Sequence, residues 1–254
     1  MEYYASSVGE LIDVVEDIHN LYVRDEKYEH HWYRGHADAS WRLIPSAQRV
    51  VASEEELRGL ANDFRIRASR IVGSEPNRED YSSWLAMMQH YGIPTRLLDW
   101  SESPLIAAFF ATEMDSYDLL ERDACVWVLR PSALNMRLGD GFLYPLDSST
   151  AHDMMQSAFV PYETEFVKEK DVLACHYVGG DTRMYAQQAC FTVHRSSDAQ
   201  LDGPDFEEYV HRIVIPAAAK ERVRLQLTML GITTGFVYPD LDHVAQSLRR
   251  LAGI

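Results

Sequence analysis

The chain has 254 residues, of which 46% are hydrophobic and 25% charged, and a formal net charge of −15. This composition is typical of a globular protein, and the acidic balance argues against broad electrostatic attachment to nucleic acid. No apolar run approaches the ~20 residues that span a bilayer, and MEYYASSVGE at the N-terminus lacks signal-peptide order. We therefore expect a cytoplasmic protein without a membrane partner and, because Cys125, Cys175 and Cys190 are widely spaced, without disulfides.

Helix signals dominate the first 111 residues. Ser7 and Ser53 each precede a Glu by three residues, which is the capping-box spacing, and an apolar stripe of helical period follows each of them. A third helix is predicted from about Ser83 to Gly92, where Pro94 prevents continuation. Ser103-Pro104 then supplies an N-cap and a proline in the first turn for the helix LIAAFFA.

The pattern changes after residue 120. Three runs rich in β-branched and aromatic residues predict strands: Ala124–Arg130, Ala189–His194 and Glu208–Ile215. The segment AAAKERVRLQLTML predicts a helix that ends at Gly231, followed by a short strand TGFVYP and a last helix near Leu241–Leu251. We expect one α+β domain over residues 1–254, with a helical part at about 1–111 packed on a strand-rich part at about 120–254.

Common catalytic motifs are absent from the sequence. It contains no phosphate-binding loop G-x-x-x-x-G-K-[ST], no G-x-G-x-x-G, no G-x-S-x-G and no H-E-x-x-H. The ten histidines show no pair at helical i, i+4 spacing with an adjacent acid, so no metal site is predicted.

Polar residues are concentrated in two segments whose other residues are mostly apolar or aromatic and are expected to be buried. In residues 31–49, a predicted strand with Trp32 and Tyr33 ends in Arg34-Gly35, and the glycine lets another group approach the backbone closely. A buried guanidinium requires an anionic or carbonyl partner. That partner is either a ligand or a core carboxylate such as Asp99.

The second segment, residues 84–111, places a polar turn between two apolar helices. Its polar residues are Gln89, His90, Thr95, Arg96, Asp99 and Ser101. Enclosed polar groups must satisfy one another or a ligand, so this turn is either a self-contained hydrogen-bond network or a binding site. A weaker third feature is Gln187-Gln188, directly before the predicted strand ACFTVH, where one amide is expected to face a cleft.

At these residues the sequence resembles the FRG family, named for a Phe/Tyr-Arg-Gly motif. The resemblance rests on YRGH at Tyr33–His36, W-x-L-I-P-S at Trp41–Ser46, QHYGIPTRLLDWSESPLIAAFFA at Gln89–Ala111, AQQACFTVH at Ala186–His194 and the stretch Ile213–Asp242. Family members look bacterial or phage-borne and often accompany defence or toxin genes.

The motif layout in turn resembles a divergent ADP-ribosyltransferase, whose split antiparallel or mixed β-sheet encloses a cleft for NAD, the substrate. This resemblance implies that Arg34 matches the first motif position, Asp99 to Ser101 the second and Gln187-Gln188 the third. It implies catalytic roles for Arg34, Asp99 and Gln188, and NAD contacts from Tyr33, Gly35, His36, His90, Thr95, Arg96, Ser101 and Gln187. The chain departs from the pattern by carrying Gln where transferases commonly place a catalytic Glu, so Asp99 or Glu102 would supply the negative charge.

The resemblance implies an NAD-dependent ADP-ribosyltransferase, a toxin or defence effector that modifies a protein or RNA acceptor. A cognate antitoxin or inhibitor is a further partner that it implies. Two alternatives stay open at this point. One is an NAD glycohydrolase, which would use water as the acceptor, and the other is a non-catalytic module that binds a nucleotide or a protein.

Overall fold

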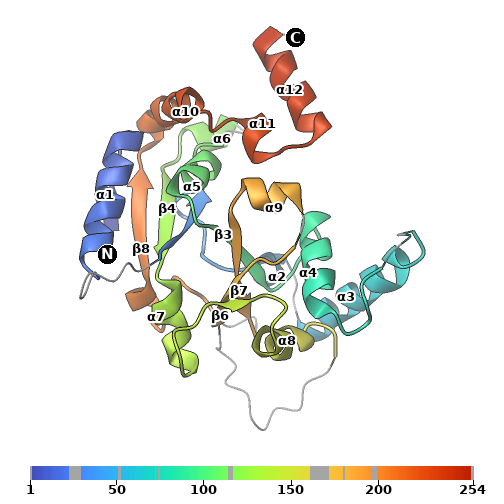
Figure 1. Ribbon diagram of the computed structural model, residues 1–254. Helices are drawn as coiled ribbons and strands as arrows, with labels where there is room; N and C mark the ends of the chain where they lie inside the picture. Colours follow the sequence, from blue (N-terminus) through green and yellow to red (C-terminus); the bar gives the residue numbers. More distant parts are fainter. Residues whose placement is uncertain are drawn as a thin grey trace.

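The computed structural model describes residues 2–22, 30–50, 53–71, 73, 75–113, 117–160, 172–179, 181–195 and 199–252, and Figure 1 shows its arrangement. In these residues eight strands form one mixed sheet in the order β1-β8-β4-β2-β3-β7-β6-β5. The pairs β1–β8 and β5–β6 are parallel and the others antiparallel. The strands are β1 (Glu2–Tyr4), β2 (Trp32–His36), β3 (Leu97–Ser101), β4 (Ala124–Leu129), β5 (Tyr144–Pro145), β6 (Val172–His176), β7 (Ala189–His194) and β8 (Val210–Ile215). The predicted α+β class is confirmed.

The predicted helix starts are confirmed at atomic detail. The hydroxyls of Ser7, Ser53 and Ser103 each accept a backbone N–H three residues further on, as N-caps do. The helices are α1 (Val8–Asn20), α2 (Ser46–Val50), α3 (Glu54–Ala68), α4 (Tyr81–His90), α5 (Pro104–Ala111), α6 (Tyr117–Leu120), α7 (Pro131–Asn135), α8 (Ser149–Gln156), α9 (Thr182–Ala186), α10 (Lys220–Met229), α11 (Thr234–Val237) and α12 (Leu241–Ala252).

Helices cover one face of the sheet in two groups. Residues of α1, α5 and α10 form a core with β2, β4 and β8, whereas residues of α3, α4 and α8 form a second core with β3, β6 and β7. The opposite face buries Trp32, Trp100 and Trp127 under α7 and residues 199–206. Both faces of the central strands are therefore enclosed.

The two halves of the sheet are joined at a single residue pair. Five residue pairs join β2 to β4, and five join β3 to β7, but β2 and β3 are paired only at Tyr33 and Ser101. Beyond that pair the two strands diverge, and backbone groups on their facing edges need other partners. The sheet therefore opens at its centre, between the strands that carry Arg34 and Asp99.

The expected separation into helices first and strands later is wrong in its first part. The strand predicted with Trp32 and Tyr33 is confirmed as β2, but β1 and β3 also lie within residues 1–111, and β2 and β3 form the middle of the sheet. Residues 97–101 were expected in a turn between helices, but they form β3. Because both faces of β3 are covered, Leu97 and Leu98 are both buried, and the alternation that identifies a half-exposed strand is lost.

The segment TGFVYP is also not a strand. Its first four residues form the short helix α11, and the hydroxyl of Thr233 accepts the N–H of Phe236 at 3.3 Å as an N-cap. A cap of this kind favours a helical turn over the β-propensity of Phe236 and Val237.

Candidate functional site

A cavity of about 340 Å³ lies where the sheet opens, and we call it the β2–β3 cavity. Its volume lies within the range typical of small-molecule sites. Residues from β2, β3, α4, α5 and α9 line it, and its aromatic walls are Tyr33, Trp41, Trp100 and Phe110. Of the residues expected at the site, the structure brings together Tyr33, Arg34, Gly35, His90, Asp99, Ser101 and Gln187.

Arg34 spans the opening between β2 and β3. Its Nη1 donates to the backbone carbonyl oxygen of Asp99 at 2.7 Å and lies 3.6 Å from the Asp99 carboxylate, while its Nε donates to Nε2 of His36 at 3.1 Å. Burial lowers the pKa of Arg34, and the neighbouring Asp99 opposes that shift. The guanidinium thus takes the place of a strand donor on the Asp99 carbonyl, and its side chain is 17% exposed toward the cavity.

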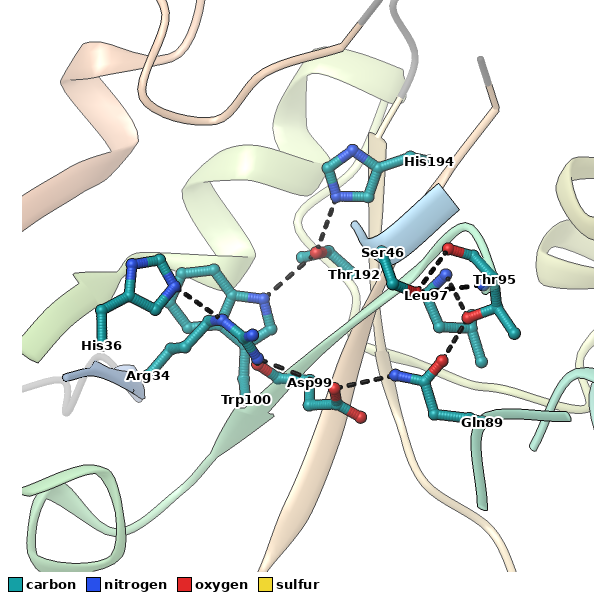
Figure 2. A network of polar contacts seen from close by, with 10 residues as sticks. All are labelled: Arg34, His36, Ser46, Gln89, Thr95, Leu97, Asp99, Trp100, Thr192 and His194. Carbon is teal, nitrogen blue, oxygen red and sulfur yellow. Dashed lines mark hydrogen bonds and ion pairs between the residues drawn. The ribbon is translucent and has the colours of Figure 1, made fainter. Parts of the chain in front are cut away.

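A chain of hydrogen bonds holds the Asp99 carboxylate at the cavity wall (Figure 2). The carboxylate accepts from Nε2 of Gln89 at 2.8 Å, and the Gln89 carbonyl oxygen accepts from the hydroxyl of Thr95. Thr95 is fully buried, accepts the N–H of Leu97 at 3.2 Å and donates its own N–H to Ser46. Contrary to expectation, Thr95 does not line the cavity, because β3 begins two residues later and turns it into the core.

His36 and Arg96 were also expected to contact NAD, and the structure places both outside the cavity walls. His36 is buried behind Arg34, and burial together with Arg34 and Arg49 lowers its pKa to about 3, so it is neutral and accepts the Arg34 N–H. Arg96 is buried against α3 and α8, where it forms an ion pair with Glu54 and donates to Ser157 at 2.5 Å. It therefore does not pair with Asp99.

The two glutamines face different cavities. Gln187 lines the β2–β3 cavity, its backbone carbonyl accepts the Ser101 hydroxyl at 2.7 Å, and its Nε2 donates to the carbonyl of Val237 at 3.2 Å. Gln188 has a left-handed backbone with φ of 46° and is exposed. It lines a neighbouring cavity of about 710 Å³ together with Glu102 and His176. Gln188, for which a catalytic role was expected, therefore does not line the cavity that contains Arg34 and Asp99, whereas Gln187 does.

The carboxylates are divided in the same way. Asp99 and Glu113 line the β2–β3 cavity, whereas Glu102 lines the neighbouring one and lies 3.4 Å from Nδ1 of His176. Consecutive residues of an extended chain point in opposite directions, which separates Glu102 from Ser101. Of the two carboxylates considered from the sequence, only Asp99 faces Arg34.

Gly35 has a structural explanation. An added Cβ would lie 1.9 Å from the carbonyl oxygen of Ala107 and 2.5 Å from the backbone nitrogen of Ala111, both in α5. The close approach expected from the sequence is therefore made by helix α5, which packs on β2 at this point.

Sequence reasoning missed Arg183, which reaches the cavity from α9. Its guanidinium lies over the ring of Tyr238, with the central carbon 4.8 Å from the ring centre. A single Arg in a five-residue helix has no local pattern that distinguishes it from a surface residue. Only the placement of α9 beside α4 and β3 reveals its position.

The comparison with protein families supports the FRG family. Residues 29–118 match the FRG domain, and this segment contains β2, α4, β3 and α5 and thus most of the cavity walls. No curated protein and no solved structure matches the chain. Within the described residues, no group of three or more His, Cys, Asp or Glu is placed to hold a metal, and no helix is long and apolar enough to cross a membrane.

Proposed function

We propose that this protein is an NAD-dependent ADP-ribosyltransferase that modifies a macromolecular acceptor. One observation carries the proposal: Arg34, Asp99 and Gln187, which come from three segments far apart in sequence, line one cavity at the opening of a mixed sheet. The resemblance to ADP-ribosyltransferases implies that the three motifs meet at one cleft, although it gives the catalytic role to Gln188 and not to Gln187. The proposal extends to a toxin or defence effector in the cytoplasm, with a protein or RNA acceptor and a cognate inhibitor as partners.

The reaction breaks the bond between C1′ of the nicotinamide ribose and the nicotinamide nitrogen, and the bonding electron pair leaves with nicotinamide. The remaining ribose develops positive charge, as in glycoside cleavage. A nucleophilic atom of the acceptor then forms the new bond to C1′, and its proton passes to a base. The protein must stabilise the charge and hold the ribose in place for attack.

The cavity residues divide these tasks. Asp99 and Glu113 both line the cavity, and Asp99 is the carboxylate that lies beside Arg34, at 3.6 Å. We therefore assign to Asp99 the stabilisation of the ribosyl cation and the acceptance of the acceptor's proton, since Gln187 brings no charge. The remaining Arg34 N–H groups bind ribose or phosphate oxygens, and Gln187 and Ser101 orient hydroxyls. Tyr33 and Trp100 are both buried, so among the aromatic residues at the cavity Trp41, which is 43% exposed, offers a flat face to nicotinamide.

The test is incubation of the pure protein with NAD, with and without a cell lysate. Chromatography measures nicotinamide release, and mass spectrometry detects ADP-ribose adducts. We expect release and adducts from the wild type, and a loss of at least about 100-fold in Asp99→Asn, the scale found when one stabilising group is removed. Arg34→Ala is expected to abolish turnover.

Glu102→Gln is the matched control, because this carboxylate lines the other cavity and its loss should leave turnover unchanged. Nicotinamide release without any adduct would identify a glycohydrolase in place of a transferase. Binding of NAD without release would identify a non-catalytic binding module. Equal turnover in the wild type and Asp99→Asn would contradict the role given to Asp99.

A further inference from the structure

Arg183 is half-buried, and its Nε is enclosed without a hydrogen-bond partner among the described residues. It lines the β2–β3 cavity. Within the described part of the chain, its guanidinium makes no hydrogen bond and no ion pair, and its contact is with the ring of Tyr238. Buried polar groups in folded proteins are nearly always satisfied, so an unpaired guanidinium beside a cavity indicates an anion that binds there.

The position of Arg183 is fixed from both sides. The Asp181 carboxylate caps α9 by accepting the backbone N–H groups of Arg183 and Met184 at 2.8 and 3.3 Å, and it lies 3.3 Å from Nδ1 of His90 in α4. On the other side, the Tyr238 ring supports the guanidinium. The cation is therefore held at the cavity before any ligand arrives.

Arg34 also lines the cavity, but its guanidinium already has hydrogen-bond partners within the protein. Its Nε and Nη1 donate to His36 and to the Asp99 carbonyl, and the Asp99 carboxylate lies close enough to neutralise it. Among the residues that the structure describes, no carboxylate forms an ion pair with Arg183. The binding free energy of an anion is therefore expected to be more favourable at Arg183 than at Arg34, because at Arg183 the anion displaces no protein partner.

We infer that Arg183 binds the diphosphate of the dinucleotide, with the nicotinamide ribose between Arg34 and Asp99. This inference rests on the proposed function, since it assigns the two halves of NAD to two parts of one cavity. The guanidinium fork matches phosphate oxygens in a two-point geometry. Arg183 thus acts as a substrate-binding residue and Asp99 as the group at the reacting carbon.

The test is calorimetric titration of wild type, Arg183→Gln and Arg183→Lys with NAD, ADP-ribose and nicotinamide riboside, which has no phosphate. We expect Arg183→Gln to weaken NAD and ADP-ribose about 10- to 100-fold, the loss typical of one charged hydrogen-bonded contact. Nicotinamide riboside should bind wild type and variant equally. Arg183→Lys should fall between them, because it keeps the charge and loses the fork.

Arg67→Gln is the matched control. Arg67 is exposed at the end of α3, so this variant should bind every ligand with the affinity of the wild type. Thermal unfolding of each variant checks that it is folded. Equal NAD affinity in wild type and Arg183→Gln would overturn the inference even if NAD is turned over. Arg183-dependent binding of ADP-ribose without nicotinamide release would refute the transferase and keep the phosphate site. Failure of the wild type to bind NAD and ADP-ribose would overturn both.

Discussion

At the scale of single residues, neighbouring positions of β2 serve different partners. Arg34 donates to β3 and to His36, and the next residue, Gly35, lies against the backbone of α5. Because successive side chains of a strand point to opposite faces, Arg34 can face the cavity while Gly35 packs against a helix. The Tyr-Arg-Gly motif therefore combines a site residue with a packing residue.

Replacement of Gly35 by Ala is expected to destabilise the fold by about 3 kcal/mol or more, because the methyl group would collide with the α5 backbone rather than with a movable side chain. Gly59→Ala is the matched control. It lies inside α3 with no atom within 4 Å of an added Cβ, and it should stabilise the protein by about 0.5–1 kcal/mol. Urea unfolding measures both changes. An unchanged midpoint in Gly35→Ala would contradict the close packing of α5.

At the scale of elements, the sequence predicted best those features that depend on a few adjacent residues. The caps at Ser7, Ser53 and Ser103 are local hydrogen bonds, and all three helix starts were predicted correctly. Strand β3 escaped detection because its identity depends on pairing with β7, 90 residues away. Which of Gln187 and Gln188 lines the cavity depends on the left-handed backbone at Gln188. Glutamine rarely adopts this conformation, so the sequence does not predict it.

Asp181 caps helix α9, and we expect this cap to hold the cavity wall that α9 forms. Asp181→Ala removes the acceptor of two helix N–H groups and the partner of His90, a loss of about 0.5–2 kcal/mol for a cap of this kind. Because α9 has only five residues, we expect faster amide exchange within it and weaker ADP-ribose binding, with little change in the global unfolding temperature.

Hydrogen exchange measured by mass spectrometry, together with titration of ADP-ribose, checks this expectation. Ser148→Ala is the control, since Ser148 caps α8 outside the cavity and should speed exchange there without affecting binding. Slow exchange in α9 of the Asp181→Ala protein would show that packing rather than the cap holds this helix.

At the scale of the whole molecule, the convergence of the three motifs depends on the sheet and not on any one segment. Arg34, Asp99 and Gln187 meet because β2 and β3 are adjacent and α9 returns the chain to β7 beside Ser101. Their convergence was expected from the family resemblance. Composition and periodicity could not supply it, because they describe only local neighbours. Arg183 is the clearest example of what the sequence could not predict. It became a candidate ligand contact only when the structure placed its guanidinium at the cavity without a hydrogen-bond partner among the described residues.

The same enclosure of polar groups makes the whole fold sensitive to acid. Four buried histidines have pKa values lowered chiefly by burial: about 4 for His31, His194 and His211 and about 3 for His36. In the unfolded chain their pKa is near 6.5. Between these values the unfolded state binds protons that the folded state excludes, so the free energy of unfolding falls as the pH decreases from about 6.5 toward 4.

Each such histidine contributes about 1.4 kcal/mol per pH unit in that window, so the four together give a slope of about 5.5 kcal/mol per pH unit. Since typical domains are stable by about 5–15 kcal/mol, we expect acid unfolding between about pH 4 and pH 5.5. Neutralisation of surface carboxylates relieves the repulsion of the −15 charge and acts in the opposite direction. At physiological salt this effect is small, because exposed charges are screened within about 8 Å.

Urea unfolding at several pH values from 7.5 to 4.5 measures the slope. His31→Phe should reduce it by about 1.4 kcal/mol per pH unit, because the variant keeps a buried ring and has no proton to bind in the unfolded state. Phe191→Leu provides the comparison, since it alters a fully buried ring that has no proton to bind and should leave the slope unchanged. A stability that stays constant from pH 7 to pH 5 would mean that water reaches these rings and that they are not enclosed as the structure places them.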